Sequence, residues 1–454
     1  MRSTTAIVLV GALLLAAPAV SEEEADVASQ LRAMQERMSQ LEDRLEATSD
    51  ELAEAHSRVE EQHKLIERSG LATESANASA LASFLENVEM GGWISGSYVY
   101  NFEGHDSENL AGANSGPGVL PFKGDTNSFQ LDQLWFELEK GVTEDSRAGF
   151  RADIVYGKTA GLLSGCAGCA DGTLGDELEL YQAYIQYLAP VFGGTTLKFG
   201  KFGTVIGAEV AGARDNFNIT RGHVYNLFEP ITHTGILAST DFGGGGSISL
   251  GLVNETRSFP AADIDLNNNK AVIWSLGWGW DTVSVSFAGA YGDSDSGQGT
   301  ALGTRGTPSG DKEMILDFIL SWDPNDAFSA YINADYIDSE NSTDPTAEFD
   351  GYGIAVAGRY AVNDRLGLAL RGEYATLESD APQSLLVSSE ELTLYGITGT
   401  VDYALTEDLL VRAELRYDSS DSSDTLFEDA FTNEEGLFRE DDQFIGAVEV
   451  IYTF

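Results

Sequence analysis

The sequence predicts an all-β transmembrane protein, a 16-stranded antiparallel outer-membrane β-barrel preceded by an α-helical coiled-coil segment. Three observations predict this fold class. Apolar and polar residues alternate after residue 88, the connections between the alternating stretches switch between short and long, and the N-terminus carries a secretory signal. The 49 Gly and 10% aromatic residues agree with it, because turns need glycine and strands favour aromatic side chains.

The first 19 residues have the three parts of a secretory signal peptide. Arg2 precedes an apolar run over residues 6–17, and Ala17, Pro18 and Ala19 resemble a cleavage site. We expect cleavage after Ala19. An uncleaved anchor is the alternative, but the run is shorter than the roughly 20 apolar residues that a membrane-spanning helix needs.

Residues 20–69 carry a heptad pattern that predicts a periplasmic coiled-coil helix. Apolar positions recur at spacings of four and three from Val27 to Ile66. Self-association into two or three strands is the favoured interpretation, and a single amphipathic helix lying on another surface is the alternative. Residues 70–87, rich in Ala, Ser and Asn, are predicted to be a linker before a barrel domain at 88–454.

The alternation in residues 88–454 has the period of β-strands. Leu366, Leu368 and Leu370, for example, alternate with small or charged residues, so one face of this segment is apolar and the other polar. The polar face is expected to line the interior of the barrel. Sixteen such segments begin near residues 91, 127, 146, 177, 195, 234, 246, 270, 282, 312, 326, 348, 364, 390, 407 and 441.

Short and long connections alternate between these segments, as an outer-membrane barrel requires if turns face one side of the membrane and loops the other. The short connections contain Asp, Asn, Gly and Pro, which form turns. Aromatic residues beside them predict an interfacial girdle, which the alternative fold, a soluble β-sandwich, would lack. These residues are Tyr187, Phe192, Phe242, Trp278, Trp280, Trp322, Phe328, Tyr360 and Tyr403.

The charge balance excludes one large class of partners. The chain has 73 Asp and Glu against 26 Lys and Arg, a net charge of −47, so it would repel the phosphate backbone of a nucleic acid. We expect cations, small solutes and outer-membrane lipid as partners. Residues 418–442 are strongly acidic. Solvated surface charge is the favoured interpretation, and divalent cations that bridge the loops to lipopolysaccharide are the alternative.

The last strand ends in a pattern with a known resemblance. Residues 444–454 alternate and stop on an aromatic residue. This ending is similar to the terminal-strand signal that the outer-membrane barrel assembly machinery reads, with Tyr452 and Phe454 in the signal positions. The resemblance implies that this machinery is a partner of the chain.

A second resemblance is carried by short stretches between residues 182 and 235. They are 182–185 (QAYI), 198–202 (KFGKF), 207–209 (GAE), 216–221 (NFNITR) and 233–235 (HTG). In these stretches the chain resembles the putative beta-barrel porin-2 family, although Thr220 stands where we expect Ser and the heptad segment lies outside that domain. The resemblance implies a bacterial outer-membrane porin for passive diffusion of small hydrophilic solutes and ions, without a cofactor. We expect a homotrimer, with a dimer as the alternative.

Residues 203–232, which follow the fifth strand, are predicted to narrow this pore. In sixteen-stranded porins the loop at this place folds into the lumen, and this one is less polar than an exposed loop should be. A surface loop that caps the barrel is the alternative. The residues expected at the constriction are Glu209, Arg214, Asp215, Arg221 and His223.

The alternation also predicts which charges line the lumen. Opposed bases and acids would order water across the pore and favour small polar solutes. Solvated charges or simple cross-strand pairs are the alternative for each residue. The expected wall residues are Arg151, Lys198, Arg359, Arg371, Glu373, Arg412, Glu414 and Arg416, with Asp317 and Asp335 among the other inward-facing acids.

Catalytic and metal chemistry find little support in the sequence. Cys166 and Cys169 lie in a long loop of an exported chain, so a disulfide is predicted, with metal binding beside His105 as the alternative. A hydrolase would pair a Ser with His105, His223 or His233, but none has a Ser-based motif beside it. We therefore predict no metal site and no catalytic residue.

A structural role is the rival to a porin. In that hypothesis a closed barrel anchors the coiled coil, which tethers the outer membrane to peptidoglycan. Deleting residues 20–80 separates the two functions, because a porin would still conduct whereas a tether would lose its attachment to the cell wall.

Overall fold

The computed structural model describes the chain in nine stretches, and each lies in the second of its two compact units, Leu85–Phe454. The predicted signal peptide, coiled coil and linker, together with His105, Cys166 and Cys169, lie outside the described residues. The described residues are 88–102, 122, 127–163, 177–257, 269–293, 312–340, 348–379, 391–420 and 442–454.

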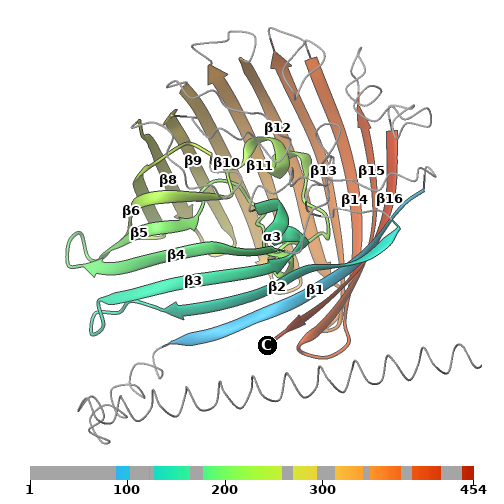
Figure 1. Cartoon of the computed structure of the whole chain (residues 1–454), viewed down its shortest axis with the longest axis horizontal. Coiled ribbons are helices and arrows are strands. Elements are labelled where there is room, and N and C mark those ends of the chain that lie inside the picture. Colours follow the sequence, from blue (N-terminus) through green and yellow to red (C-terminus); the bar gives the residue numbers. More distant parts are fainter. Residues whose placement is uncertain are drawn as a thin grey trace, which may run out of the picture. The chain divides into compact units, whose positions relative to one another are not determined.

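Sixteen antiparallel strands form a closed barrel in which each strand pairs with its neighbours in sequence and β1 pairs with β16 (Figure 1). The strands are β1 (Glu89–Asn101), β2 (Ser128–Lys140), β3 (Ala148–Gly157), β4 (Glu177–Ala189), β5 (Thr195–Gly203), β6 (Thr232–Gly243), β7 (Gly246–Val253), β8 (Ala271–Gly279), β9 (Val283–Asp293), β10 (Lys312–Asn325), β11 (Phe328–Glu340), β12 (Phe349–Ala361), β13 (Leu366–Ser379), β14 (Glu391–Ala404), β15 (Leu409–Ser420) and β16 (Asp442–Thr453).

The predicted strand count and strand order are confirmed. Every strand begins within about two residues of its predicted start, as the bounds above show. The connections alternate as predicted: residues 244–245 and 326–327 make two-residue turns, whereas residues 204–231 separate β5 from β6. Because antiparallel neighbours are joined by alternating short and long connections, all the long ones leave the same end of the barrel.

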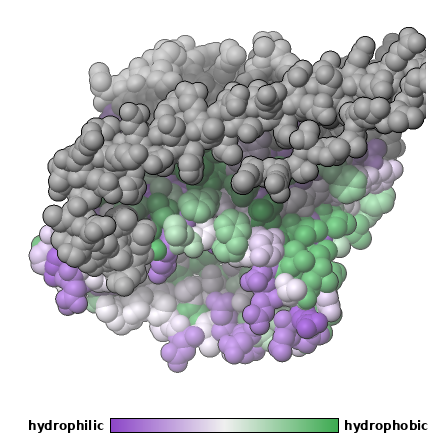
Figure 2. All heavy atoms as spheres, turned by 60° about the horizontal axis from the view of Figure 1, so that its bottom comes forward, coloured by the Kyte–Doolittle hydropathy of each residue, from purple (hydrophilic) through white to green (hydrophobic). Residues whose placement is uncertain are grey.

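The two faces of each strand differ in the way the alternation predicts. On β13, Leu368 and Leu370 are 44% and 58% exposed, whereas Arg371, the residue that follows Leu370, is fully buried. Side chains of successive residues point to opposite faces, so the exposed leucines mark the outer face of the barrel. Hydrophobic residues form patches across the middle of the face shown in Figure 2, and hydrophilic residues lie along its lower edge.

Aromatic side chains near the short turns are exposed on the outer face, as an interfacial girdle requires. Phe192 is 85% exposed and Trp280 is 59% exposed, and Phe328 is half-buried. Within the described residues, no helix is both long enough and apolar enough to cross a membrane.

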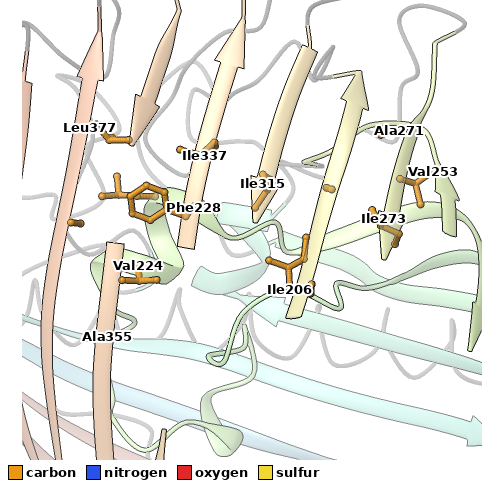
Figure 3. Packing of buried hydrophobic residues seen from close by; sticks show 14 of the residues in the cluster. Ile206, Val224, Phe228, Val253, Ala271, Ile273, Ile315, Ile337, Ala355 and Leu377 are labelled. Carbon is orange, nitrogen blue, oxygen red and sulfur yellow. The ribbon is translucent and has the colours of Figure 1, made fainter. Parts of the chain in front are cut away.

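An apolar core lies on the inner face of the barrel. Ile206 and the short helix α4 (His223–Phe228) come from the connection between β5 and β6, and two residues of α4 join Ile206 in this core (Figure 3). The helix packs on β11, β12 and β13. The helical pair is Val224 and Phe228, and both are nearly inaccessible to solvent. Burying such side chains stabilises the packed arrangement by roughly 1.5–3 kcal/mol each.

Candidate functional site

Residues 204–231, here called the crossing segment, span the interior of the barrel. The segment leaves β5 and returns to β6, and between them contains a 3-10 turn, η1 (Ala213–Asp215), and α4. Its backbone bonds to strands far away in the barrel: Ala208 N donates to Asn333 Oδ1 on β11 at 2.8 Å, and Ile219 N donates to Glu414 Oε2 on β15 at 2.6 Å. In a ring of sixteen strands β5 and β13 are eight positions apart, so the segment reaches the opposite wall.

Three arginines on that opposite wall hold the segment, and we call Arg371, Arg412 and Arg416 the arginine anchor. Each donates to backbone carbonyl groups of the segment, because a guanidinium carries five N–H donors in a rigid fork. The contacts are Arg371 Nη1 to Thr220 O at 2.7 Å, Arg412 Nη1 to Asn216 O and Nη2 to Ala213 O at 2.8 Å each, and Arg416 Nη1 to Arg221 O at 2.7 Å.

The same arginines are paired with buried carboxylates. Arg371 bonds Glu373 and, on the crossing segment, Glu209; Arg412 bonds Glu449, and Arg416 bonds Asp418. These guanidinium groups are at most 2% exposed. A buried charge needs both an ion pair and hydrogen bonds, and the segment supplies part of the latter.

Glu414 completes this wall by accepting hydrogen bonds from consecutive backbone groups. Its carboxylate accepts from Ile219 N at 2.6 Å and from Thr220 N at 3.0 Å, and the Thr220 hydroxyl donates to it at 2.6 Å. Thr400 on β14 donates a further bond at 2.7 Å. Charge-assisted bonds of this kind are the stronger class, so residues 219–220 are fixed to β15.

The crossing segment is also folded onto itself and onto β15 by its own side chains. Arg221 donates to the carbonyl oxygens of Val210, Ala211 and Ile219, and it is 2% exposed. His223 Nε2 lies 2.9 Å from Asp418 Oδ1 and is equally buried. Of the predicted constriction residues, Glu209 and His223 thus bond to the wall, and Arg221 bonds within the segment.

Two predicted constriction residues have a different environment. Arg214 and Asp215 pair with each other at 3.1 Å, with side chains 32% and 50% exposed. Arg214 also lies over the ring of Trp93 and 3.5 Å from Glu137 on β2. Val210, which is 40% exposed, belongs to the same solvent-facing edge of the segment.

The predicted wall residues outside the arginine anchor pair with other wall residues. Arg151 on β3 bonds Glu137, Glu139 and Asp153 at 2.8–3.0 Å, with a side chain 25% exposed. Lys198 on β5 lies 4.7 Å from the ring centre of Tyr184, and Arg359 on β12 bonds Asp402 on β14.

Gln133 on β2 is a structural residue that the sequence analysis missed. Its Oε1 accepts from Trp93 Nε1 and Ala213 N at 2.9 Å each, and its Nε2 donates to Ala211 O at 2.7 Å. Nε2 also donates to Thr159 in α3 (Lys158–Leu163), a short helix packed on β2, β3 and β4 (Figure 1). The amide therefore ties η1 and α3 to one strand.

The C-terminus closes the barrel beside β1. Phe454 and Gly92 exchange backbone hydrogen bonds at 3.0 Å, and Tyr452 pairs with Ile94. Tyr452 and Phe454 are 47% and 51% exposed. Within the part of the chain that the structure covers, no group of three or more His, Cys, Asp or Glu is placed to hold a metal ion.

A closed barrel of sixteen antiparallel strands, apolar outside and crossed inside by the connection after β5, has the architecture of an outer-membrane porin. A family model described as Putative beta-barrel porin-2, OmpL-like, matches residues 87–454. The chain belongs to this family, and its membership supports a place in the bacterial outer membrane.

Solved structures of outer-membrane channels share the fold. OmpT of Vibrio cholerae in its trimer form has a TM-score of 0.53 at 12% identity, over 81% of this chain and 99% of that one. The channel DcaP of Acinetobacter baumannii scores 0.50 at 12% identity, and Salmonella typhi OmpF in complex with daunomycin scores 0.50 at 14% identity. Both cover 81% of this chain and 97% of theirs. A search of curated proteins finds no match to the chain.

Proposed function

We propose that the protein lets small hydrophilic solutes and ions diffuse passively through the barrel, and that the crossing segment narrows the path. The observation that carries this proposal is the attachment of the segment to β11, β13 and β15 after it leaves β5. A segment fixed at both ends of a diameter takes space from any path through the lumen. The family and the barrel fold support the porin role itself.

The exposed residues of the crossing segment are those that a passing solute would meet. The polar atoms of Glu209, Arg221 and His223 bond to the barrel wall or to the segment itself. Arg214 and Asp215 remain partly exposed, as does Val210. We therefore assign the constriction to an edge with one ion pair and one apolar side chain, which favours small polar solutes with only weak charge preference.

Single-channel recording of the refolded full chain in a planar bilayer under a salt gradient tests this function. A water-filled path gives stable open steps and a measurable reversal potential. Protein that is folded and inserted but silent would contradict the porin and favour a closed barrel that anchors the N-terminal segment. Removal of residues 20–80 is the matched control, because it should leave the conductance unchanged.

Assembly into a homotrimer is part of the same proposal, supported by the shared fold of a porin whose structure is described as a trimer form. Chemical crosslinking of intact cells should then show a species of about three times the mass of the chain. A pattern with monomer alone would remove the trimer without affecting the pore. Binding of Tyr452 and Phe454 by the barrel assembly machinery, a disulfide between Cys166 and Cys169, and contacts with lipopolysaccharide or peptidoglycan stay predictions.

A further inference from the structure

Two aspartates face each other where residues 207–208 of the crossing segment contact β10 and β11. Asp317 on β10 and Asp335 on β11 are direct partners in the strand register, and both are nearly fully buried. Asn333 lies between them: its Nδ2 donates to Asp317 Oδ1 at 2.8 Å and to Asp335 Oδ1 at 3.1 Å. Like charges directly opposite each other on a sheet are destabilising, so this pair needs a compensating feature.

The compensating feature is not a basic side chain. The described residues give neither aspartate an ion pair, and Arg371 of the anchor pairs with Glu209 and Glu373. Each aspartate also has an Oδ2 atom that is buried and receives no donor. The two carboxyl groups are nevertheless within hydrogen-bonding reach of each other, an interaction that requires a proton on one of them.

A third carboxyl group comes from the crossing segment itself. Glu229 is 7% exposed, and its Oε2 is buried without a donor. It fills the space where Gly207 lacks a side chain, since a Cβ on Gly207 would overlap its carboxyl group. Gly207 N in turn donates to Asp317, and the next backbone N–H, of Ala208, donates to Asn333. The carboxyl groups and the backbone of residues 207–208 thus form one buried cluster.

We infer that Asp317, Asp335 and Glu229 form a proton-binding site, and that a bound proton holds residues 204–208 of the crossing segment against β10 and β11. With a proton present, the carboxyl groups hydrogen-bond to one another and the segment docks on them. Without it, two or three negative charges face each other in a buried place with no described cation, and the docked backbone is released. The arginine anchor holds the far end of the segment in both states.

The direction of the pH dependence follows from the environment of Glu229. Burial raises its pKa well above the usual value of a glutamate, and the surrounding carboxylates raise it further. A raised pKa in the folded state means that the docking free energy is fully present at low pH and is lost as the pH rises through that pKa. The groups that face Glu229 are Asp335, Asp317, Glu209 and Glu373, and Tyr225 and Tyr331 lie near it.

Docking of the segment is measured without reference to conduction by hydrogen exchange of the full chain in micelles, from about pH 5 to about pH 9. Protection of residues 204–208, after correction for intrinsic exchange, should fall by about tenfold or more across this range. Protection of residues 216–221, at the arginine anchor, should stay constant. In Asp335→Asn the first stretch should keep its protection at high pH.

Asp402→Asn is the matched control, because it removes one inward carboxylate of β14 that pairs with Arg359 and lies outside the cluster. It should leave the pH dependence as it is. If Asp335→Asn does not fold, Glu229→Gln carries the same test from the loop side. Protection of residues 204–208 that is independent of pH in the native chain, or that changes with pH in Asp335→Asn and Glu229→Gln as it does in the native chain, would overturn the inference.

Any effect of this site on pore width rests on the proposed porin function. Single-channel conductance over the same pH range reads that step separately, and in Asp335→Asn it should lose its pH dependence. A silent barrel with pH-dependent protection would contradict the porin and leave the proton site standing. Conductance and protection that are both independent of pH would support the porin and contradict the proton site.

Discussion

At β13 and β15 the crossing segment is held by three guanidinium groups. At β10 and β11 it contacts two aspartates and an asparagine, and it adds a carboxyl group of its own, Glu229. Arginine stays charged at every pH of interest, and each member of its anchor has a carboxylate partner. The carboxyl cluster has no such partner among the described residues and changes charge with protonation. The same backbone is therefore fixed at one end and conditionally held at the other.

Breaking the arginine anchor should have the largest effect. Arg412→Ala removes the buried ion pair with Glu449 and the donors to Asn216 O and Ala213 O, so we expect a loss of about 3–5 kcal/mol in the free energy of unfolding. Urea unfolding in micelles measures it. Arg359→Ala is the control: its guanidinium is 36% exposed and touches no residue of the segment among its described bonds, so about 1 kcal/mol or less is expected.

The opposite end is broken by giving Gly207 a side chain. Gly207 has φ +92, and a Cβ there would overlap Glu229, so Gly207→Ala should cost roughly 1–3 kcal/mol and lower the protection of residues 204–208. Gly372→Ala is the matched control, since nothing lies within 4 Å of its Cβ position. Equal stability of the two variants would show that the packing of Glu229 against Gly207 contributes little.

The comparison is sharpened by the pH dependence of stability. Glu229→Gln removes the carboxyl group whose pKa burial raises, so stability should fall less between neutral and alkaline pH than in the native chain. Unfolding curves at several pH values measure this slope. An unchanged slope would assign the pH dependence to groups outside the cluster.

The smallest effect on stability is expected at the exposed edge. Arg214→Ala removes a side chain that is 32% exposed, so the free energy of unfolding should change by about 0.5 kcal/mol or less. Loss of this positive charge should shift the reversal potential towards cation selectivity. Arg221→Ala is the contrasting variant, because Arg221 is buried and its loss should disturb the fold of the segment.

The positions of the strands were predictable because they depend on the alternation of apolar and polar residues, which is visible between neighbours in the sequence. The same parity placed Arg371, Arg412 and Arg416 on the inner face. Their partners were not predictable, since Arg371 meets Thr220 at a separation of 151 residues, and no local pattern encodes which strand lies opposite β5. The roles within the crossing segment, buried for Arg221 and exposed for Arg214, likewise follow only from the folded path.

Gln133 shows a second limit of reading the alternation. The β1–β2 ladder shifts register between Ser95 and Gly96, and Asp132 and Gln133 are adjacent yet both buried. A β-bulge inserts one extra residue and changes the parity of the face. The only signal of Gln133 in the sequence was the pair of consecutive polar residues inside an otherwise alternating strand. A selection of wall residues by charge misses it, because its amide is uncharged.

The attachment of the crossing segment to β15 has a consequence for how the barrel is built. Ile219 and Glu414 are 195 residues apart, so most strands of the barrel lie between the segment and this partner in the sequence. Closing so long a loop costs entropy before the contact forms. A chain that ended before β15 would lack Arg412, Glu414 and Arg416, and residues 213–221 would lose most of the bonds that fix them to the wall.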